Sequence, residues 1–273
     1  MRVLTWNLWW RFGPWDARRK AILAVLREQR PDVVALQEVW ANEEENLAGW
    51  LARELGFAHW TWARFGHPEH WQRRVPGDTS DIGVAILSRW PITEEAVLPL
   101  PAEGAVDNGR VALYASLDSP TGPVPVFTTH LNSAVYDSAV RCRQVTALAH
   151  FVKERGWNGA FGPVVTGDFN AWPDSDEIRL FGGYKTAPPV PKQVFVDAWE
   201  YADPAAPRAT WDSTNAYHSP GPSARIDYIH LGGVRDNGAG AVQGVARFGH
   251  GPVDGIWPSD HAGVRVDLAE GTE

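Results

Sequence analysis

Short apolar runs that stop at a polar residue recur along the chain of 273 residues, and they constrain the fold more than any other feature. Runs of about four to eight residues that are rich in β-branched side chains are typical of buried strands. We interpret as strands the runs Val3–Leu8, Asp32–Val39, Gly83–Ser88, Ala96–Leu100, Val111–Leu117, Val124–His130, Val164–Thr166, Ile226–Ile229 and Ala262–Val266. The sequence therefore predicts a strand-rich molecule.

Helical spacing appears in three segments between these runs. Asp16–Gln29 begins with a capping aspartate, Ser138–Arg155 carries apolar residues at helical intervals, and a third helix ends at Gly56. Asn42, followed three residues later by an acid, resembles the capping box of that third helix. The aromatic and basic stretch Trp60–Ser80 fits no period, and we interpret it as a long surface loop.

Two strand-rich halves, each with helices, favour an α/β sandwich of two sheets packed face to face. Hydrophobic residues make up 44% of the chain and charged residues 21%, which is ordinary for a globular protein with a sizeable core. Nothing along the chain resembles a linker. We therefore expect one domain over residues 1–273.

The lone Cys142 cannot form an internal disulfide, the N-terminus lacks the apolar stretch of a signal peptide, and no stretch has the roughly 20 apolar residues of a membrane span. These features predict a cytoplasmic protein without a membrane span. The net charge of −8 argues against a long nucleic-acid footprint but suits a small phosphorylated substrate. Part of the negative excess is consistent with carboxylates that hold a cation.

Polar side chains at the ends of the apolar runs are the candidate site. They are Asn7, Glu38, His130, Asp168 with Asn170, Asp227, and Asp260 with His261. If the chain stays extended through Phe169, Asp168 and Asn170 point the same way. Carboxylates, amides and histidines supply what hydrolysis of a phosphate ester needs: ligands for a hard cation, a positioned water and help for the leaving oxygen. Oxygen ligands favour Mg²⁺ or Mn²⁺, and one cysteine cannot build a structural zinc site.

These motifs resemble, in order and over nearly the whole chain, the endonuclease/exonuclease/phosphatase superfamily of deoxyribonuclease-like metal-dependent phosphohydrolases. The matching segments are Thr5-Trp6-Asn7, Leu36-Gln37-Glu38, Gly83–Arg89, Thr129-His130-Leu131, Gly167-Asp168-Phe169-Asn170, Arg225–Ile229 and Ser259-Asp260-His261. The resemblance implies a four-layered α/β/β/α sandwich of two mostly antiparallel sheets, with the site at one edge.

The resemblance also implies a role for each residue. Glu38 would hold the metal, helped by Asn7 and Asp260. Asp168 would orient or deprotonate the attacking water beside Asn170. His261, steered by Asp227, and His130 would bind the phosphate, and which histidine acts as acid or base stays open.

The substrate is left open by the sequence. A nuclease-like phosphodiesterase is the first hypothesis; a phosphatase of a small phosphomonoester, a phospholipid-headgroup phosphodiesterase and an inactive binding scaffold are the alternatives. Trp9 stands where some nucleases of the superfamily carry a second acidic ligand, and the Trp-Thr-Asp-Arg run of inositol phosphatases is missing.

Further residues have two interpretations each. Arg110 and Arg141, with Arg143, are candidates to bind substrate phosphate or are ordinary surface arginines. A set of tryptophans could form a stacking floor for a ring or pack in the core: Trp9, Trp10, Trp15, Trp62 and Trp71. The oligomeric state is open.

Overall fold

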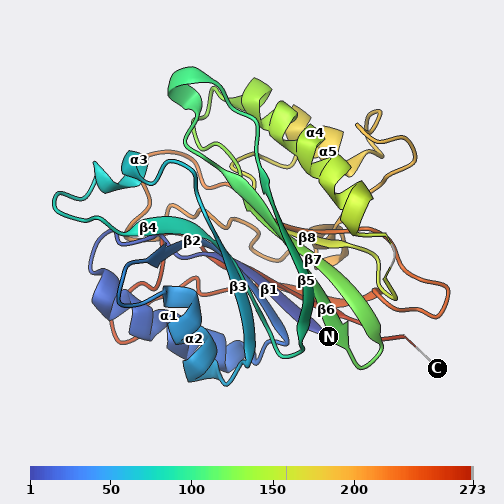
Figure 1. Cartoon of the computed structure of the whole chain (residues 1–273), viewed down its shortest axis with the longest axis horizontal. Coiled ribbons are helices and arrows are strands. Elements are labelled where there is room, and N and C mark those ends of the chain that lie inside the picture. Colours follow the sequence, from blue (N-terminus) through green and yellow to red (C-terminus); the bar gives the residue numbers. More distant parts are fainter. Residues whose placement is uncertain (158, 272–273) are drawn as a thin grey trace.

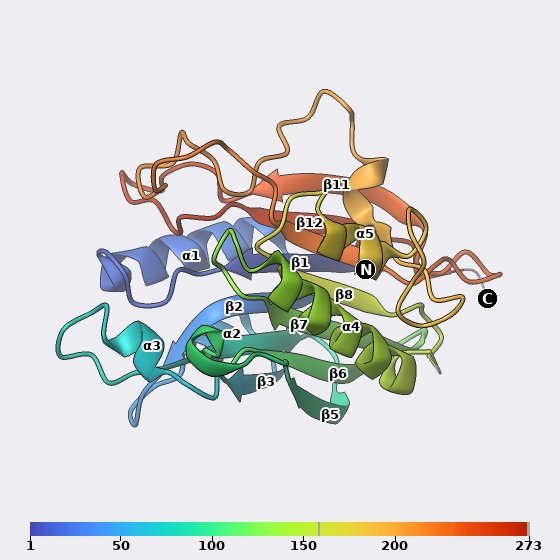
Figure 2. The same cartoon turned by 90° about the horizontal axis from the view of Figure 1, so that it is seen from above.

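The computed structural model describes residues 1–157 and 159–271 and has four layers. Figure 1 shows two sheets packed against each other, with helices α1 and α2 on one side and α4 and α5 on the other; Figure 2 shows the layers from above. The helices are α1 (Trp15–Gln29), α2 (Leu47–Leu55), α3 (Glu69–Gln72), α4 (Ser138–Arg155) and α5 (Asp176–Gly182). The expected α/β/β/α sandwich is confirmed.

The first sheet has the strand order β11-β12-β1-β2-β4-β3. Its strands are β1 (Arg2–Asn7), β2 (Val33–Ala41), β3 (His59–Arg64), β4 (Asp81–Ser88), β11 (Val242–Phe248) and β12 (Gly263–Leu268). β1 and β2 are parallel, as expected for strands joined through a helix, and the other described pairs are antiparallel.

The second sheet has the order β5-β6-β7-β8-β10-β9. Its strands are β5 (Ile92–Pro99), β6 (Val111–Ser119), β7 (Gly122–His130), β8 (Val164–Asp168), β9 (Val196–Asp197) and β10 (Asp227–Leu231). Among the described strands of this sheet, only β7 and β8, which are joined through α4, pair in parallel. The prediction of two mostly antiparallel sheets therefore holds.

Both faces of the central strands are covered. Val126 belongs to the larger apolar cluster, which combines the two sheets with α1 and α2, whereas its neighbour Phe127 packs under α4 and α5. Side chains alternate along a strand, so a strand buried on both faces needs a continuous apolar run. This explains why such runs were the main signal in the sequence.

The prediction of a surface loop over Trp60–Ser80 is wrong. The segment contains most of β3 and the short helix α3, and Phe65 and Trp71 are buried. β3 is an edge strand that alternates buried Thr61 and Ala63 with the exposed Trp60 and the half-buried Trp62, and these large side chains on its other face hid the period.

The cap of α2 is also not the predicted one. The side chain of Asn46 accepts hydrogen bonds from the N–H groups of Ala48 and Gly49, while Asn42 closes a turn just before it. Within the described residues, no helix has both the length and the apolar character that crossing a membrane requires. One domain over residues 1–273 stays a prediction.

Candidate active site

Strand pairing in the second sheet places three of the predicted residues side by side. His130 ends β7 and pairs with Asp168, the last residue of β8; Asp168 pairs in turn with Asp227, the first residue of β10. Residues in register on neighbouring strands lie about 5 Å apart and face the same way. The three buried side chains therefore meet at one end of the sheet.

The first sheet completes this end of the sandwich. Asn7, the last residue of β1, donates from Nδ2 to Asp168 Oδ2 at 3.0 Å. The loop before β12 is tied to β1, because Ser259 Oγ donates to the Asn7 carbonyl at 2.7 Å and Trp6 Nε1 donates to the His261 carbonyl at 2.8 Å. β1 thus positions the Asn7 side chain against the second sheet and also anchors the loop that carries His261.

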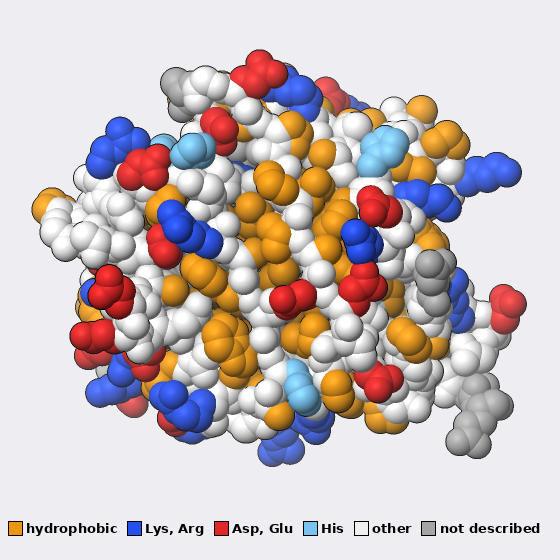
Figure 3. Space-filling view, viewed as in Figure 1, with side chains coloured by type: hydrophobic (Ala, Val, Ile, Leu, Met, Phe, Trp, Pro, Cys, Tyr) orange, Lys and Arg blue, Asp and Glu red, His pale blue; other side chains and the backbone are white. Residues whose placement is uncertain are grey.

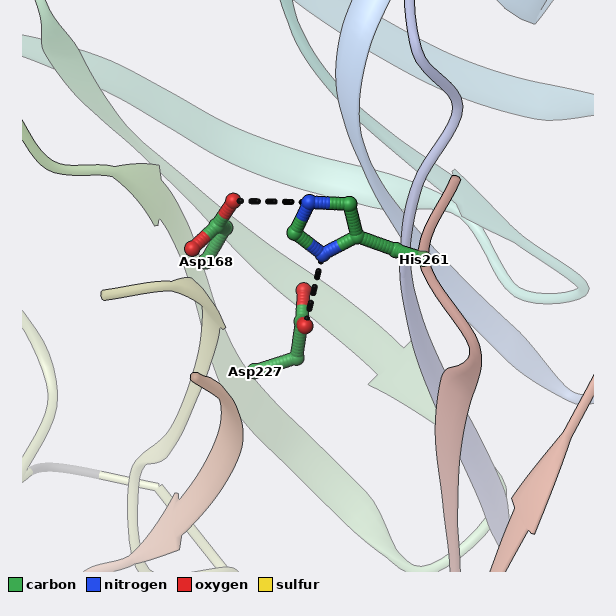
Figure 4. A group of neighbouring side chains, drawn as sticks. All are labelled: Asp168, Asp227 and His261. Carbon is green, nitrogen blue, oxygen red and sulfur yellow. Dashed lines mark hydrogen bonds and ion pairs between the residues drawn. The ribbon is translucent and has the colours of Figure 1, made fainter. Parts of the chain in front are cut away.

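His261 lies between two carboxylates (Figure 4). Its Nδ1 is 2.9 Å from Asp227 Oδ2, and its Nε2 is 3.7 Å from Asp168 Oδ2. Burial alone lowers the pKa of His261, but the charges of Asp227, Asp260 and Asp168 outweigh it and raise that pKa well above the ordinary value. The raised pKa favours the protonated ring, whose Nε2 faces Asp168.

Asp168 receives several donors on one carboxylate. Its Oδ2 is contacted by Asn7 and lies 3.3 Å from His130 Nε2, while its Oδ1 accepts the Asn170 N–H at 2.9 Å. Burial, and then the charge of Asp227, raise the pKa of Asp168 to about 7 against the opposing effect of these donors. A carboxylate with this pKa can accept a proton near neutral pH.

The backbone at Asn170 departs from the expected extended form. Asn170 has φ 50°, in the left-handed region that asparagine tolerates better than most residues. Its N–H turns back to Asp168, and its side chain donates to the Leu131 carbonyl at 3.0 Å. The alternation through Phe169 therefore fails, yet Asn170 still holds the Asp168 carboxylate.

Glu38 lies inside β2 rather than at its end, where the sequence placed it. The register between β2 and β4 shifts between Leu36 and Val39, and Glu38 at this bulge has φ 53°. Such strain in a residue other than glycine persists only where the surroundings enforce it, and it collects at functional sites. The bulge brings Glu38 Oε1 to 3.9 Å from His130 Nδ1.

The chemistry of Glu38 and Asp260 fits a hard cation. Glu38 Oε2 is buried and has no hydrogen-bond partner among the described residues. Burial raises the pKa of Glu38, and burial together with the nearby Glu38 charge raises the pKa of Asp260 to about 7. Two buried carboxylates that resist ionisation are what a divalent cation would neutralise. Asn7 Oδ1, which accepts the Trp9 N–H at 2.9 Å, retains a second lone pair for a ligand.

A second buried group could also hold a metal ion. Potential ligand atoms of Asp168, Asp227 and His261 lie within 4.8 Å of one another. A cation bound through His261 Nδ1 would have to replace the proton shared with Asp227, whereas Glu38 Oε2 has no hydrogen-bond partner to displace among the described residues.

His130 differs from His261 in charge. Burial, then the charges of Arg110 and His261, lower the pKa of His130 well below its ordinary value. Its Nδ1 has no hydrogen-bond partner among the described residues. The two buried histidines of the site thus have pKa values shifted in opposite directions.

Of the two predicted substrate-binding arginines, the structure brings one to the site. Arg110 is buried over the rings of Phe65 and Trp71, and its Nη1 has no partner in the described part of the chain. The Phe65 ring lies 6.1 Å from the ring of His130, so Arg110 borders the site. Burial lowers the pKa of Arg110 to about 10, while the charges of Glu38 and Asp168 act in the opposite direction. Its Nε donates to Asn108 Oδ1, which leaves Nη1 as the candidate to bind an anion.

Arg141 is instead engaged elsewhere. Its guanidinium donates to the buried Glu177 and to the carbonyls of Asn132 and Ala134. Arg143 donates to the carbonyl of Ala139 in its own helix. Within the described residues, neither arginine hydrogen-bonds to a residue of the candidate site.

Most of the tryptophans predicted to be a possible stacking floor for a ring pack instead in the hydrophobic core. Trp10 and Trp71 are buried, and Trp15 and Trp62 pack against the same apolar cluster. Trp9 is the exception: it stacks on Tyr217 with ring centroids 4.5 Å apart, next to Asn7.

The sequence interpretation missed Gln37, whose Nε2 links the two sheets directly beneath the site through Thr5 Oγ1 and Thr128 Oγ1. An amide inside an apolar strand is the signal that could have identified it. It also missed Trp211, whose ring lies 5.3 Å from that of His261. No local pattern marked this residue.

Comparisons with known proteins agree with this geometry. The model of the endonuclease/exonuclease/phosphatase family matches residues 4–261. A search among curated proteins gives no match. A solved endonuclease/exonuclease/phosphatase from Beutenbergia cavernae is 26% identical with a TM-score of 0.75, covering 99% of this chain and 72% of that one.

Two more distant structures share the fold. The human Nocturnin catalytic domain with bound sulfate is 20% identical (TM-score 0.75; 98% and 94% covered), and D. rerio TDP2 complexed with a single-strand DNA product is 20% identical (TM-score 0.74; 98% of each chain covered). With a family match over nearly its whole length and the family's motif residues gathered at one end of the sandwich, the chain belongs to the endonuclease/exonuclease/phosphatase family, whose members are metal-dependent phosphoesterases.

Proposed function

We propose that this protein hydrolyses phosphodiesters by direct attack of water, without a covalent enzyme intermediate. The observation that carries the proposal is the convergence of Asn7 Nδ2, His130 Nε2 and His261 Nε2 on the buried Asp168 carboxylate. A phosphoryl group in front of these donors would meet three hydrogen-bonding groups and one proton acceptor.

Asp168 is the proposed base. Its pKa of about 7 lets it take a proton from water, and Asn170 N–H and Asn7 Nδ2 fix its orientation. His261, held as an imidazolium by Asp227, would donate from Nε2 to a phosphoryl oxygen as charge develops there. The neutral His130 would donate one further hydrogen bond to the phosphate.

Glu38 and Asp260, with Asn7, are the proposed ligands of Mg²⁺ or Mn²⁺. Their oxygen atoms suit a hard cation, and their raised pKa values reflect a cost of burial that a cation would relieve. When bound, the cation would neutralise charge on the phosphoryl oxygens and on the leaving oxygen.

The charge of the site favours a diester over a monoester. Glu38, Asp168, Asp227 and Asp260 are acidic, so a phosphodiester monoanion meets less repulsion than a phosphomonoester dianion. On the face shown in Figure 3, basic side chains are interspersed with acidic and apolar ones, whereas proteins that grip a duplex present a basic stripe. A small diester or a short single strand therefore fits better than long duplex DNA.

Hydrolysis assays test the proposal directly. We would measure cleavage of bis-p-nitrophenyl phosphate, p-nitrophenyl phosphate and a single-stranded oligonucleotide, which is included because D. rerio TDP2 binds a single-strand DNA product. Mg²⁺, Mn²⁺ and EDTA conditions would be compared for the natural chain and Asp168→Asn. We expect metal-dependent diester cleavage that falls roughly 10²–10⁴-fold in the variant.

The alternatives predict other outcomes. Cleavage of the monoester alone would favour a phosphatase. Cleavage of a choline or inositol phosphodiester, added to the same assay, without cleavage of the other substrates would favour a headgroup enzyme. Metal-independent turnover would contradict the proposed metal dependence, and absent turnover on all of them would support a binding scaffold; either result would contradict the proposal.

A further inference from the structure

A hollow of about 250 Å³ opens beside the site and is not used by the proposed chemistry. Its walls include Val135, Trp172, Trp211, Pro222 and Ile226. An apolar cavity of roughly 150 Å³ is enough to hold a benzene ring. The hollow is therefore large enough for one aromatic ring but too small for a full acyl chain.

Two residues that line the hollow, Asn170 and Trp211, also contact residues of the proposed catalytic centre. Asn170 lines it and binds Asp168 Oδ1 through its N–H. Trp211 forms an isolated β-bridge with His261, and the two rings lie 5.3 Å apart. A phosphate in contact with Asp168 and His261 would thus carry one of its ester substituents toward the hollow.

The apolar walls are exposed to solvent and held in place. Trp172 is 47% exposed and Val135 is 89% exposed. A turn fixes the Trp172 backbone, because its N–H donates to Ser175 Oγ and its carbonyl accepts the Ser175 N–H. Arg141 holds the loop that carries Val135 through the carbonyl of Ala134. Exposed apolar surface on fixed backbone indicates a binding surface that exists before the ligand arrives.

The residues that line the hollow favour a ligand with an uncharged aromatic ring. None of its described lining residues is Lys, Arg, Asp or Glu, so a further phosphate finds no counter-charge there. Two indoles offer flat faces for stacking. Ser133 and Ser219 give the wall neutral hydroxyl groups for a ring substituent, and the buried His218 Nε2 has no hydrogen-bond partner among the described residues.

We propose that this hollow binds an aromatic ring carried on the phosphate that the enzyme cleaves, so that the substrates are aryl-bearing phosphodiesters. The ring of a phenol or benzyl group and a nucleobase share this chemistry. The proposal rests on the proposed phosphodiesterase function, and its first test does not depend on turnover.

The first test is calorimetric binding of two phosphonates to the natural chain in Mg²⁺. Phenylphosphonate and methylphosphonate carry the same charged group and have no ester bond to cleave. We expect the phenyl compound to bind roughly tenfold more tightly, as stacking of one ring on an indole implies. Trp172→Ala should abolish this difference and Trp172→Phe should keep most of it.

Trp60→Ala is the matched control, because Trp60 is 41% exposed and lines a different hollow with His59 and Glu95. It should leave the phenyl preference intact. Equal affinity for the two phosphonates, or a preference that survives Trp172→Ala, would overturn the proposal.

The second test separates the hollow from the chemistry. Hydrolysis of methyl benzyl phosphate, methyl cyclohexylmethyl phosphate and thymidine 5′-methyl phosphate is followed by phosphorus NMR. The first two have leaving alkoxides of the same kind and differ in the ring. A kcat/KM several-fold higher for the benzyl or thymidine ester supports the proposal and identifies the source of the ring, whereas equal values for the benzyl and cyclohexylmethyl esters overturn it.

The two failures are distinguishable. Preferred binding of phenylphosphonate without hydrolysis of any ester would contradict the phosphodiesterase function and support the aromatic-ring site. Hydrolysis of all three esters at equal rates, with equal phosphonate affinities, would support the phosphodiesterase function and contradict the aromatic-ring site.

Discussion

A single carboxylate, Asp227, controls the charge of His261. It is buried on β10, contacts His261 Nδ1, and is the largest attractive charge that raises the pKa of that ring. In Asp227→Asn the carboxamide cannot stabilise an imidazolium in the same way. We expect kcat to fall roughly 10²–10⁴-fold and the His261 pKa to drop, measured by steady-state kinetics and by nitrogen NMR of the ring.

Asp267→Asn is a suitable control for this variant, because Asp267 pairs with Arg2 at the other end of β1. It should leave both quantities unchanged. An Asp227→Asn protein in which His261 titrates as before would show that the dyad does not set its charge.

His230 makes the folded protein sensitive to acid. Both of its ring nitrogens are buried without a hydrogen-bond partner among the described residues, and the ring stacks on Tyr228 with centroids 5.2 Å apart. Burial lowers the pKa of His230 from 6.5 to about 4. Because the unfolded chain binds the proton more readily, stability falls as pH drops from 6.5 to about 4, by up to on the order of 3 kcal/mol.

Denaturant unfolding of the natural chain and His230→Phe at pH 7.5 and pH 5 checks this. The phenyl ring keeps the stacking on Tyr228 and cannot be protonated, so the variant should lose much less stability at pH 5. An equal loss in both proteins would mean that other groups cause the acid sensitivity.

At the scale of elements, α4 and α5 are joined by a buried ion pair. Arg141 on α4 donates to Glu177 on α5, and both side chains are nearly inaccessible. Removal of one partner leaves the other charge buried and unpaired, so Arg141→Met should lower the free energy of unfolding by about 3–5 kcal/mol. Denaturant unfolding measures this loss.

The matched control is Arg143→Met, since Arg143 is exposed on the same helix and donates to the Ala139 carbonyl. It should change stability by no more than about 0.5 kcal/mol. Glu177→Gln in the Arg141→Met background should recover part of the loss by removing the unpaired charge. A loss of equal size in Arg141→Met and Arg143→Met would contradict the assignment.

Elements with strong periodicity could be predicted from the sequence, and weakly patterned ones could not. The bounds of α4 agree with the predicted Ser138–Arg155, because its apolar residues recur over a long segment. α5 has only seven residues and β9 only two, too few for a period to appear. β11 is a half-exposed edge strand with a bulge at Gly244, which interrupts the alternation.

The site was predictable in its residues but not in its geometry. Carboxylates and histidines within apolar runs stand out because an unpaired buried charge is costly. The left-handed backbones of Glu38 and Asn170 depend on strand register and on contacts distant in sequence. The same holds for Arg141, because nothing local to it reveals Glu177.

At the scale of the whole molecule, the proposed cation site should couple metal binding to folding. Both sheets and the loop before β12 supply carboxylates to one end of the sandwich, among them the half-buried Glu38 and the buried Asp260. Without a cation, ionisation of these groups opposes folding, because burial raises the pKa of each. A bound cation would attract the same carboxylate charges, so their ionisation would then stabilise the folded protein.

Mg²⁺ should therefore raise the melting temperature of EDTA-treated protein at pH 8. Binding at a concentration 100 times the Kd stabilises by about 2.7 kcal/mol, which corresponds to a Tm rise of several degrees for a chain of this size. The variant Glu38→Gln removes the negative charge of the Glu38 carboxylate and keeps the shape of the side chain. This variant should melt higher than the natural chain in EDTA and gain little from Mg²⁺, so the order of the two proteins reverses on metal addition.

Differential scanning calorimetry of the natural chain, Glu38→Gln and Glu45→Gln checks this reversal. Glu45 pairs with Arg19 at a partly exposed position, so its variant should respond to Mg²⁺ as the natural chain does. A Glu38→Gln protein that gains as much from Mg²⁺ as the natural chain would place the cation elsewhere, with the Asp168, Asp227 and His261 group as the next candidate. A reversal would show instead that the buried carboxylates reduce stability in the metal-free fold and increase it once the cation is bound.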